Sequence, residues 1–200
     1  LQDRTILEYP LSREKAKKVL KIAGKYDTLQ EAYFDREVYA QEDQLKRISQ
    51  YHKNPHMWEY VRATRTAVPS LTEWYEMSGR DADKLQLMFA DMQELAHARK
   101  ELEEIPGLVL TGSLGNNIEV NAEGIDKGIG ILELGRRLGI SREEIMACGD
   151  GDNDLEMLKA VGVGVAMGNA DAAVKAAADY VTDTNEEEGV AKAVEMFALR

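Results

Sequence analysis

Three aspartates at alternate positions, Asp150, Asp152 and Asp154, occur in the segment CGDGDNDLEML. The segment follows a short apolar run and continues into a helical pattern, so the carboxylates are expected where a strand ends. Carboxylates that gather at one point repel each other unless a cation neutralises them, and Mg²⁺ is a hard ion that prefers oxygen ligands. The spacing therefore favours a magnesium site.

Two other interpretations of the acidic segment deserve comparison. A calcium-binding loop is excluded, because the glycine and the closing glutamate that such a loop needs are replaced by Leu155 and Val161. The alternative interpretation, a solvated acidic turn that caps the helix expected at residues 154–161, is not excluded. A position at a strand end in an α/β sheet favours the metal site over this turn.

Composition limits the partners of the protein. The 200 residues are 44% hydrophobic and carry a net charge of −11, which argues against nucleic acid and anionic membranes as partners. A small phosphorylated metabolite stays compatible, because a bound cation reverses the local field. The single cysteine, Cys148, excludes an internal disulfide and a cysteine-based zinc cluster. No apolar run reaches the roughly 18 residues of a membrane span, and no signal peptide is recognisable, so we expect a cytoplasmic protein.

The first part of the chain has an irregular pattern. Residues 5–11 predict a strand, and residues 12–121 alternate unevenly between helical and strand-like segments, which favours a small open-faced α+β layer. The predicted helices cover residues 12–26, 42–52, 56–68 and 92–105. The predicted strands are a hairpin at 28–41, a strand at 83–90 and a strand pair within 108–124.

The second part has a regular α/β rhythm. Strands alternating with helices of this length predict a parallel, Rossmann-like sheet, in which ligands bind at the carboxyl ends of the strands. The acidic segment lies at such an end. The predicted helices cover residues 126–139, 154–161, 169–179 and 187–199, and the predicted strands cover 145–149, 163–167 and 180–184.

The segment GDGDNDLEMLKAVGVGVAMGNA, preceded by GIDKG, resembles the C-terminal half of the haloacid dehalogenase-like superfamily. It is most similar to the Cof-type phosphatases with a large α/β (C2B) cap. The resemblance implies three regions: a core or hinge strand at 1–11, an α+β cap domain at 12–121, and the C-terminal half of a Rossmann-like core at 122–200. It also implies Mg²⁺-dependent hydrolysis of small phosphate monoesters, such as sugar phosphates, through an aspartyl-phosphate.

The same resemblance implies roles for five residues. Asp150 would bind Mg²⁺, and Asp154 would bind it directly or through water. Asn153 would hold the network on the phosphate side. Lys127 would steady the nucleophilic aspartate and the charge of the transferring phosphoryl group, as phosphoryl transfer requires. Asn169 would lie at the mouth of the active site, or else cap the helix that follows it.

Two motifs of the family do not occur in these 200 residues: Asp-x-Asp-Gly-Thr, which carries the nucleophile, and the Ser or Thr that ends the next core strand. We therefore expect the nucleophile on an N-terminal segment that is missing here, and no complete catalytic cycle from this chain alone. Without that segment, the strand at 145–149 has an unpaired edge through which the chain could self-associate. Asp152 occupies the variable position of its motif and is expected to face solvent.

Other interpretations of the sequence are weaker. The alternative to an enzyme is a non-catalytic truncated fragment that binds a metal or a partner chain. The glycines of GVGVAMG are spaced one residue away from the dinucleotide-binding fingerprint, which argues against a nicotinamide cofactor. His52, His56 and His97 lack ligand spacing and are expected at the surface.

Overall fold

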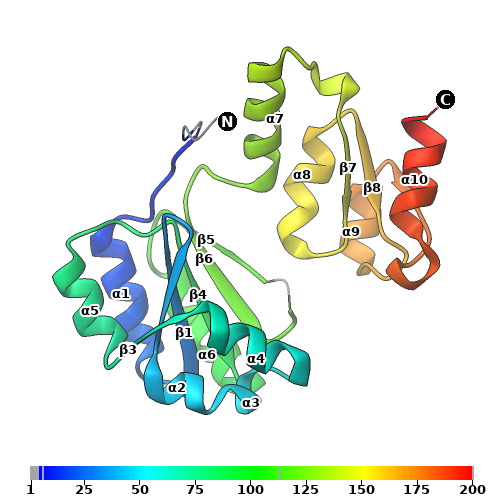
Figure 1. The fold of residues 1–200 in the computed structure, drawn as a ribbon. Helices are drawn as coiled ribbons and strands as arrows, with labels where there is room; N and C mark the ends of the chain where they lie inside the picture. The colour runs from blue at the N-terminus through cyan, green and yellow to red at the C-terminus, as the bar shows by residue number, and fades with distance from the viewer. Residues whose placement is uncertain (1–4, 6, 113, 200) are drawn as a thin grey trace. The chain divides into compact units, whose positions relative to one another are not determined.

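The computed structural model of the chain describes residues 5, 7–112 and 114–199. The chain divides into two compact units, each described by itself below (Figure 1). The N-terminal unit consists of Glu8–Gly124, and the C-terminal unit is built on Ile125–Arg200. None of the helices in the described part is both long and apolar enough to cross a bilayer.

The N-terminal unit contains a six-stranded sheet in the order β3-β2-β1-β4-β6-β5. Its pairs are antiparallel except for the parallel pair β2 and β3. The predicted hairpin and strand pair are confirmed, with Asp35 and Arg36 both at positive φ in the tight hairpin turn. The strands are β1 (Thr28–Phe34), β2 (Glu37–Gln41), β3 (Thr66–Val68), β4 (Lys84–Phe89), β5 (Leu108–Thr111) and β6 (Asn117–Ala122).

Helices cover both faces of this sheet. Alternate strand residues point to opposite faces, so Phe34 and Leu87 belong to a core with one set of helices and Leu29 and Met88 to a core with another. The first set is α1 (Arg13–Ala23), α5 (Leu71–Ser78) and α6 (Met92–Glu103). The second set is α2 (Glu42–Lys46), α3 (Ile48–Tyr51) and α4 (Pro55–Thr64).

The C-terminal unit contains a parallel sheet in the order β7-β8-β9, which confirms the predicted Rossmann-like arrangement (Figure 1). In the described residues β7 forms one edge of this sheet. The strands are β7 (Met146–Gly149), β8 (Val163–Ala166) and β9 (Tyr180–Val181). The α-helices are α7 (Lys127–Leu138), α8 (Leu155–Ala160), α9 (Ala172–Ala177) and α10 (Gly189–Phe197). Short 3₁₀ turns are η1 (Arg142–Glu144), η2 (Asp152–Asp154) and η3 (Asn185–Glu187).

The strand expected near the N-terminus is not formed in the described part of that segment. Residues 1–4 and 6 lie outside the described residues, and residues 5 and 7–10 have no regular structure. Leu11 makes a single antiparallel bridge to Ala82, with backbone hydrogen bonds of 2.7 and 3.1 Å.

Two helix predictions were also wrong in extent. The helix expected at 42–52 is interrupted at Arg47 between α2 and α3. The helix expected at 56–68 ends at Thr64, because the following residues pair with β2 as β3. Arg65, between the two, forms an ion pair with the buried carboxylate of Glu31 at 2.6 Å. Pairing across the sheet thus outweighs the local helical pattern.

His52 is buried, contrary to the expectation of a surface residue. Only 7% of it is exposed, and its Nε2 has no hydrogen-bond partner among the described residues. His52 directly follows α3, whose Ile48 and Tyr51 pack on the sheet, and it is buried together with them. Burial and the charge of Arg65 lower the pKa of His52, against the opposing effect of Glu31.

In the C-terminal unit, α7 approaches α8 closely at Gly128. A β carbon at this position would lie 2.9 Å from both the Ala160 Cβ and the backbone oxygen of Glu156. Such distances are well below van der Waals contact, so only glycine fits without moving a helix. The close approach holds the start of α7, and with it Lys127, near α8.

We predict that Gly128→Ala destabilises the C-terminal unit by about 1–3 kcal/mol, because the added methyl group overpacks the contact between α7 and α8. Gly130 lies in the same helix, and a β carbon there would have nothing within 4 Å. Gly130→Ala should therefore be neutral or stabilise by about 0.5–1 kcal/mol. Amide hydrogen exchange of α7 and α8 measures both effects. Equal protection in the two variants would contradict the packing argument.

We predict that the N-terminal unit loses stability as the pH falls below about 6.5, the ordinary pKa of histidine. Unfolded His52 then binds a proton that buried His52 excludes, so acid favours unfolding. Both tryptophans, Trp58 and Trp74, lie in this unit, so denaturation followed by their fluorescence measures its stability. His52→Gln should reduce the pH dependence, whereas His56→Gln, at an exposed site, should retain it.

Candidate active site

The carboxyl end of β7 forms a tight acidic turn. The strand ends at Gly149, the chain passes through Asp150 and Gly151, and η2 leads into α8. A β carbon on Gly149 would lie only 2.5 Å from the Asp154 Cβ, so a glycine is needed for the Asp154 side chain to fold back over the strand end. The acidic segment is therefore part of a packed turn.

Asp154 is the buried centre of this turn, with 6% of the residue exposed. Its Oδ1 accepts a hydrogen bond from the Lys127 Nζ at 2.5 Å, and its Oδ2 accepts from the N–H groups of Asp150 and Gly151 at 3.0 and 3.1 Å. Burial raises the pKa of Asp154, but Lys127 and the two N–H groups outweigh it and hold the pKa below its usual range. The carboxylate stays ionised at neutral pH.

Lys127 reaches this carboxylate from the first position of α7. The carboxylate of Asp126 caps the helix by accepting from the N–H of Ile129 at 2.8 Å, and this orients its first turn. The Lys127 side chain is half exposed, so its ammonium faces both Asp154 and the solvent. Asp126 had no predicted role, although an aspartate directly before a helix is a recognisable cap signal.

Asn169, in the loop after β8, links the acidic turn after β7 to η3 after β9. Its Nδ2 donates to the Asp150 Oδ2 at 3.0 Å, and its Oδ1 accepts from the N–H of Asn185 at 3.1 Å. The helix-capping alternative for Asn169 is wrong, because Asp171 occupies the N-cap position of α9. No sequence pattern predicted a role for Asn185, because it contributes through its backbone N–H.

The two remaining residues of the segment lie on η2. Asn153 is half-buried, and its side-chain oxygen would be 2.9 Å from a β carbon on Gly151, so it folds over the turn. Asp152 is exposed, as predicted from its place in the motif. The structure thus brings Lys127, Asp150, Asn153, Asp154 and Asn169 together at the ends of β7 and β8; their chemical roles stay predictions.

The donor set permits a Mg²⁺ ion at Asp150. This residue is exposed and has one carboxylate oxygen hydrogen-bonded to Asn169. Both oxygens of Asp154 already accept hydrogen bonds, which fits contact through water better than direct ligation. The described residues contain no group of three side chains suited to enclose a metal. Mg²⁺ often binds through one or two carboxylates, waters and substrate phosphate, so this set fits such an ion.

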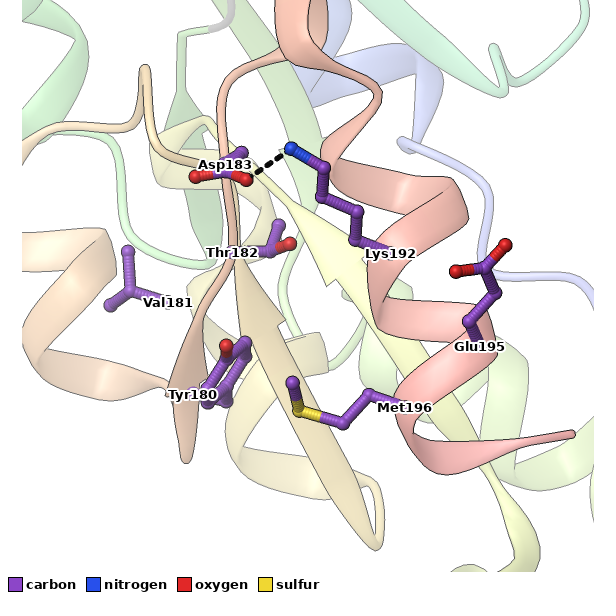
Figure 2. A pocket seen from close by; sticks show the side chains of 7 residues that line it. All are labelled: Tyr180, Val181, Thr182, Asp183, Lys192, Glu195 and Met196. Atoms are coloured by element: carbon purple, nitrogen blue, oxygen red, sulfur yellow. Dashed lines mark hydrogen bonds and ion pairs between the residues drawn. The ribbon is translucent and has the colours of Figure 1, made fainter. Parts of the chain in front are cut away.

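A pocket of about 430 Å³ lies elsewhere in the C-terminal unit, between β9 and α10. Figure 2 shows its walls, with the ion pair of Asp183 and Lys192 on one side and Tyr180 and Met196 on the other. None of the residues predicted for catalysis or metal binding lines it. Since it lacks the acidic turn and Lys127, we place the candidate site at the ends of β7 and β8.

Comparison with known sequences gives consistent relatives. The phosphatase YcsE of Bacillus subtilis, named for 5-amino-6-(5-phospho-D-ribitylamino)uracil, is 49% identical over 100 residues, half of this chain and 40% of its own length. The putative phosphatase YkrA of the same organism is 32% identical across 99% of this chain and 71% of its own length. The chain thus spans less than half the length of YcsE.

Solved structures share the fold. The subclass IIB sugar phosphatase BT4131 of the haloacid dehalogenase superfamily superimposes with a TM-score of 0.79 at 26% identity, over 100% of this chain and 72% of that one. A haloacid dehalogenase-like hydrolase from B. subtilis gives a TM-score of 0.80 at 26% identity, over 94% of this chain and 72% of that one. The model of the haloacid dehalogenase-like hydrolase family matches residues 1–194. The chain therefore belongs to the haloacid dehalogenase-like hydrolase family.

Proposed function

We propose that the protein containing this chain hydrolyses small phosphate monoesters with Mg²⁺, through an aspartyl-phosphate intermediate. The observation that carries the proposal is the contact of Lys127 with Asp154 beside the exposed Asp150, at the carboxyl end of a parallel strand. A cation and an acidic metal ligand side by side suit a reaction that moves a charged phosphoryl group. Family membership and phosphatase relatives support this assignment.

Each residue has a defined part in the proposal. The Lys127 ammonium stabilises negative charge that spreads over the oxygens of the transferring phosphoryl group. Asp150 and water would hold Mg²⁺, with Asp154 in contact through water, and Asn169 keeps the Asp150 carboxylate oriented. When bound, Mg²⁺ neutralises the charge of the phosphate. Asn153 completes the polar lining of the turn.

The nucleophile is proposed to lie outside these 200 residues. The Asp-x-Asp-Gly-Thr motif does not occur in the sequence, and the chain covers 72% of the BT4131 chain. The edge of β7 and a neighbouring apolar groove of about 270 Å³, which includes Leu134, Leu138 and Ile145, offer a surface for further polypeptide. Self-association through this edge, or a non-catalytic role in binding a partner, is the alternative use of the same surface.

The substrate class is proposed from the relatives. BT4131 is described as a sugar phosphatase, and YcsE is named for a phosphorylated ribityl compound. We propose a phosphorylated sugar or a phosphorylated sugar-alcohol derivative for the present protein. The acidic chain, with a net charge of −11, suits a small substrate whose charge is countered locally by Lys127 and Mg²⁺.

We predict that a longer protein, which includes the nucleophile segment, releases phosphate from p-nitrophenyl phosphate. Lys127→Met and Asp150→Asn should each lower kcat by about 10²–10³ or more, because each removes charge stabilisation at the phosphoryl group. Asp152→Asn, at the exposed neighbouring aspartate, is the matched control and should retain activity. Turnover by the purified 200-residue chain that survives Asp150→Asn would contradict the proposal.

We predict that the 200-residue chain binds Mg²⁺ only weakly. One exposed carboxylate leaves the ion most of its water shell, so calorimetry should give a dissociation constant well above the micromolar range. The weak binding should be lost in Asp150→Asn and kept in Asp152→Asn. Micromolar binding that Asp150→Asn abolishes would instead show that this chain already holds a complete ligand set.

A further inference from the structure

Two loops at the carboxyl end of the C-terminal sheet are tied to each other. Gly168, after β8, donates its N–H to the backbone oxygen of Asp183, after β9, at 3.0 Å. A β carbon on Gly168 would lie 2.8 Å from the backbone nitrogen of Thr184, so the loops meet without an intervening side chain. Asn185, the first residue of η3, donates its N–H to the Asn169 Oδ1 at 3.1 Å. Two adjacent hydrogen bonds thus join the loop after β9 to the loop after β8.

The loop that contains Asn185 is itself closed by hydrogen bonds. Glu187 and Gly189 both donate their N–H groups to the backbone oxygen of Thr184, at 3.1 and 3.0 Å. Glu188 has a φ of 60°, in the left-handed region that a glutamate rarely adopts. Such strain persists where the surrounding contacts impose it, and it is common at functional sites. The N–H of Asn185 therefore has a defined direction.

The N–H of Asn185 decides which way the Asn169 amide faces. A backbone N–H can only donate, so the atom of Asn169 that faces it is the oxygen. The amide nitrogen then faces the Asp150 Oδ2, to which it donates at 3.0 Å. A reversed amide would place its NH₂ group against the N–H and its oxygen against the carboxylate, and both contacts would be repulsive. Asn185 therefore fixes the donor that Asp150 receives.

These contacts join the ends of all three strands of the described sheet. Asp150 follows β7, Asn169 follows β8 and Asn185 follows β9. All three residues are exposed, so water can satisfy each group separately and the two hydrogen bonds contribute little to stability. Their specific effect is on orientation. Because one oxygen of the Asp150 carboxylate is held, the carboxylate cannot rotate freely and its other oxygen has a defined direction.

We propose that Asn185 is a positioning residue for Mg²⁺ binding. Its backbone N–H orients the Asn169 amide, and this amide holds the Asp150 carboxylate in place for the ion. The inference rests on the proposed function, in which Asp150 binds Mg²⁺. Hydrogen bonds to a metal-binding carboxylate commonly change metal affinity, because they orient the ligand before the ion binds. The loop after β9 is thereby part of the candidate site, although none of its side chains contacts Asp150 within the described part of the chain.

Asn185→Pro removes this donor. Proline has no N–H, and its ring would occupy the place of the hydrogen, so the Asn169 oxygen has to move away. The substitution suits the backbone, because Thr184 has a φ of −70° and a ψ of 166°, the extended conformation that a residue before proline prefers. We expect the dissociation constant for Mg²⁺ to rise about tenfold. NMR on the 200-residue chain measures it from the amide resonances of Asp150 and Gly151.

Three further variants separate the N–H group from other effects. Asn185→Ala keeps the N–H and should restore the Mg²⁺ affinity of the unchanged chain. Arg142→Pro also places a proline at the first residue of a 3₁₀ turn, after Ser141 with a φ of −74° and a ψ of 161°. This turn precedes β7, at the other end of the strand from Asp150, so Mg²⁺ affinity should not change. In an Asn169→Ala chain, Asn185→Pro should have no additional effect, because it acts only through that amide.

A second measurement needs no proline. Addition of Mg²⁺ to the unchanged chain should shift the amide resonance of Asn185 together with that of Asp150, and Asn169→Ala should abolish the shift at Asn185 alone. A shift at Asn185 that is absent, or that persists in Asn169→Ala, would overturn the inference. This comparison decides the question even where Asn185→Pro disturbs the fold, which amide hydrogen exchange of β8 reveals.

The outcomes also distinguish this inference from the proposed function. Equal Mg²⁺ affinity in Asn185→Pro and Asn185→Ala would overturn the inference and leave the magnesium site intact. Additive effects of Asn185→Pro and Asn169→Ala would do the same, because Asn185 would then act by another route. If Mg²⁺ shifted no resonance at Asp150 in the unchanged chain, the magnesium site and the inference would both be refuted.

Discussion

The buried carboxylate of Asp154 is the interaction on which the candidate site depends. Removing a carboxylate from water is costly unless hydrogen bonds and an opposite charge compensate. Lys127 and the N–H groups of Asp150 and Gly151 supply both. One side chain therefore joins the start of α7 to the turn after β7 and holds Asp150 at the surface. The proposed metal ligand and the lysine are positioned by the same contact.

This contact is possible only because the backbone is closely packed around it. Gly149 leaves space for the Asp154 side chain above the strand end, and Gly128 lets α7 lie against α8. At both positions the absence of a side chain allows two parts of the chain to pack closely together. The sheet of the N-terminal unit is packed differently. It combines two apolar cores with the ion pairs of Glu31 and Lys84.

Local pattern predicted most elements of the fold, and its failures have different causes. The helices and strands of the C-terminal unit follow the predicted rhythm, because each buries one apolar face. The helix expected at 56–68 fails where Thr66–Val68 pairs with β2, a contact between distant residues. Helix α5 has no counterpart among the predicted elements, although Ser70 caps it and Gly79 ends it in the left-handed region. His52 carries no local signal of burial.

The sequence by itself determined the family, the parallel sheet and the residues that gather at its end. Apolar periodicity is a local property and predicted the sheet, the spacing of the aspartates indicated a cation site, and the resemblance to the family named Lys127, Asp150, Asn153, Asp154 and Asn169. Only the tertiary structure decided that Asp154 is a buried anchor and Asp150 the exposed carboxylate, or that Asn169 binds Asp150 instead of capping α9. Burial and hydrogen bonding depend on which distant segments meet, and a single sequence does not encode that locally.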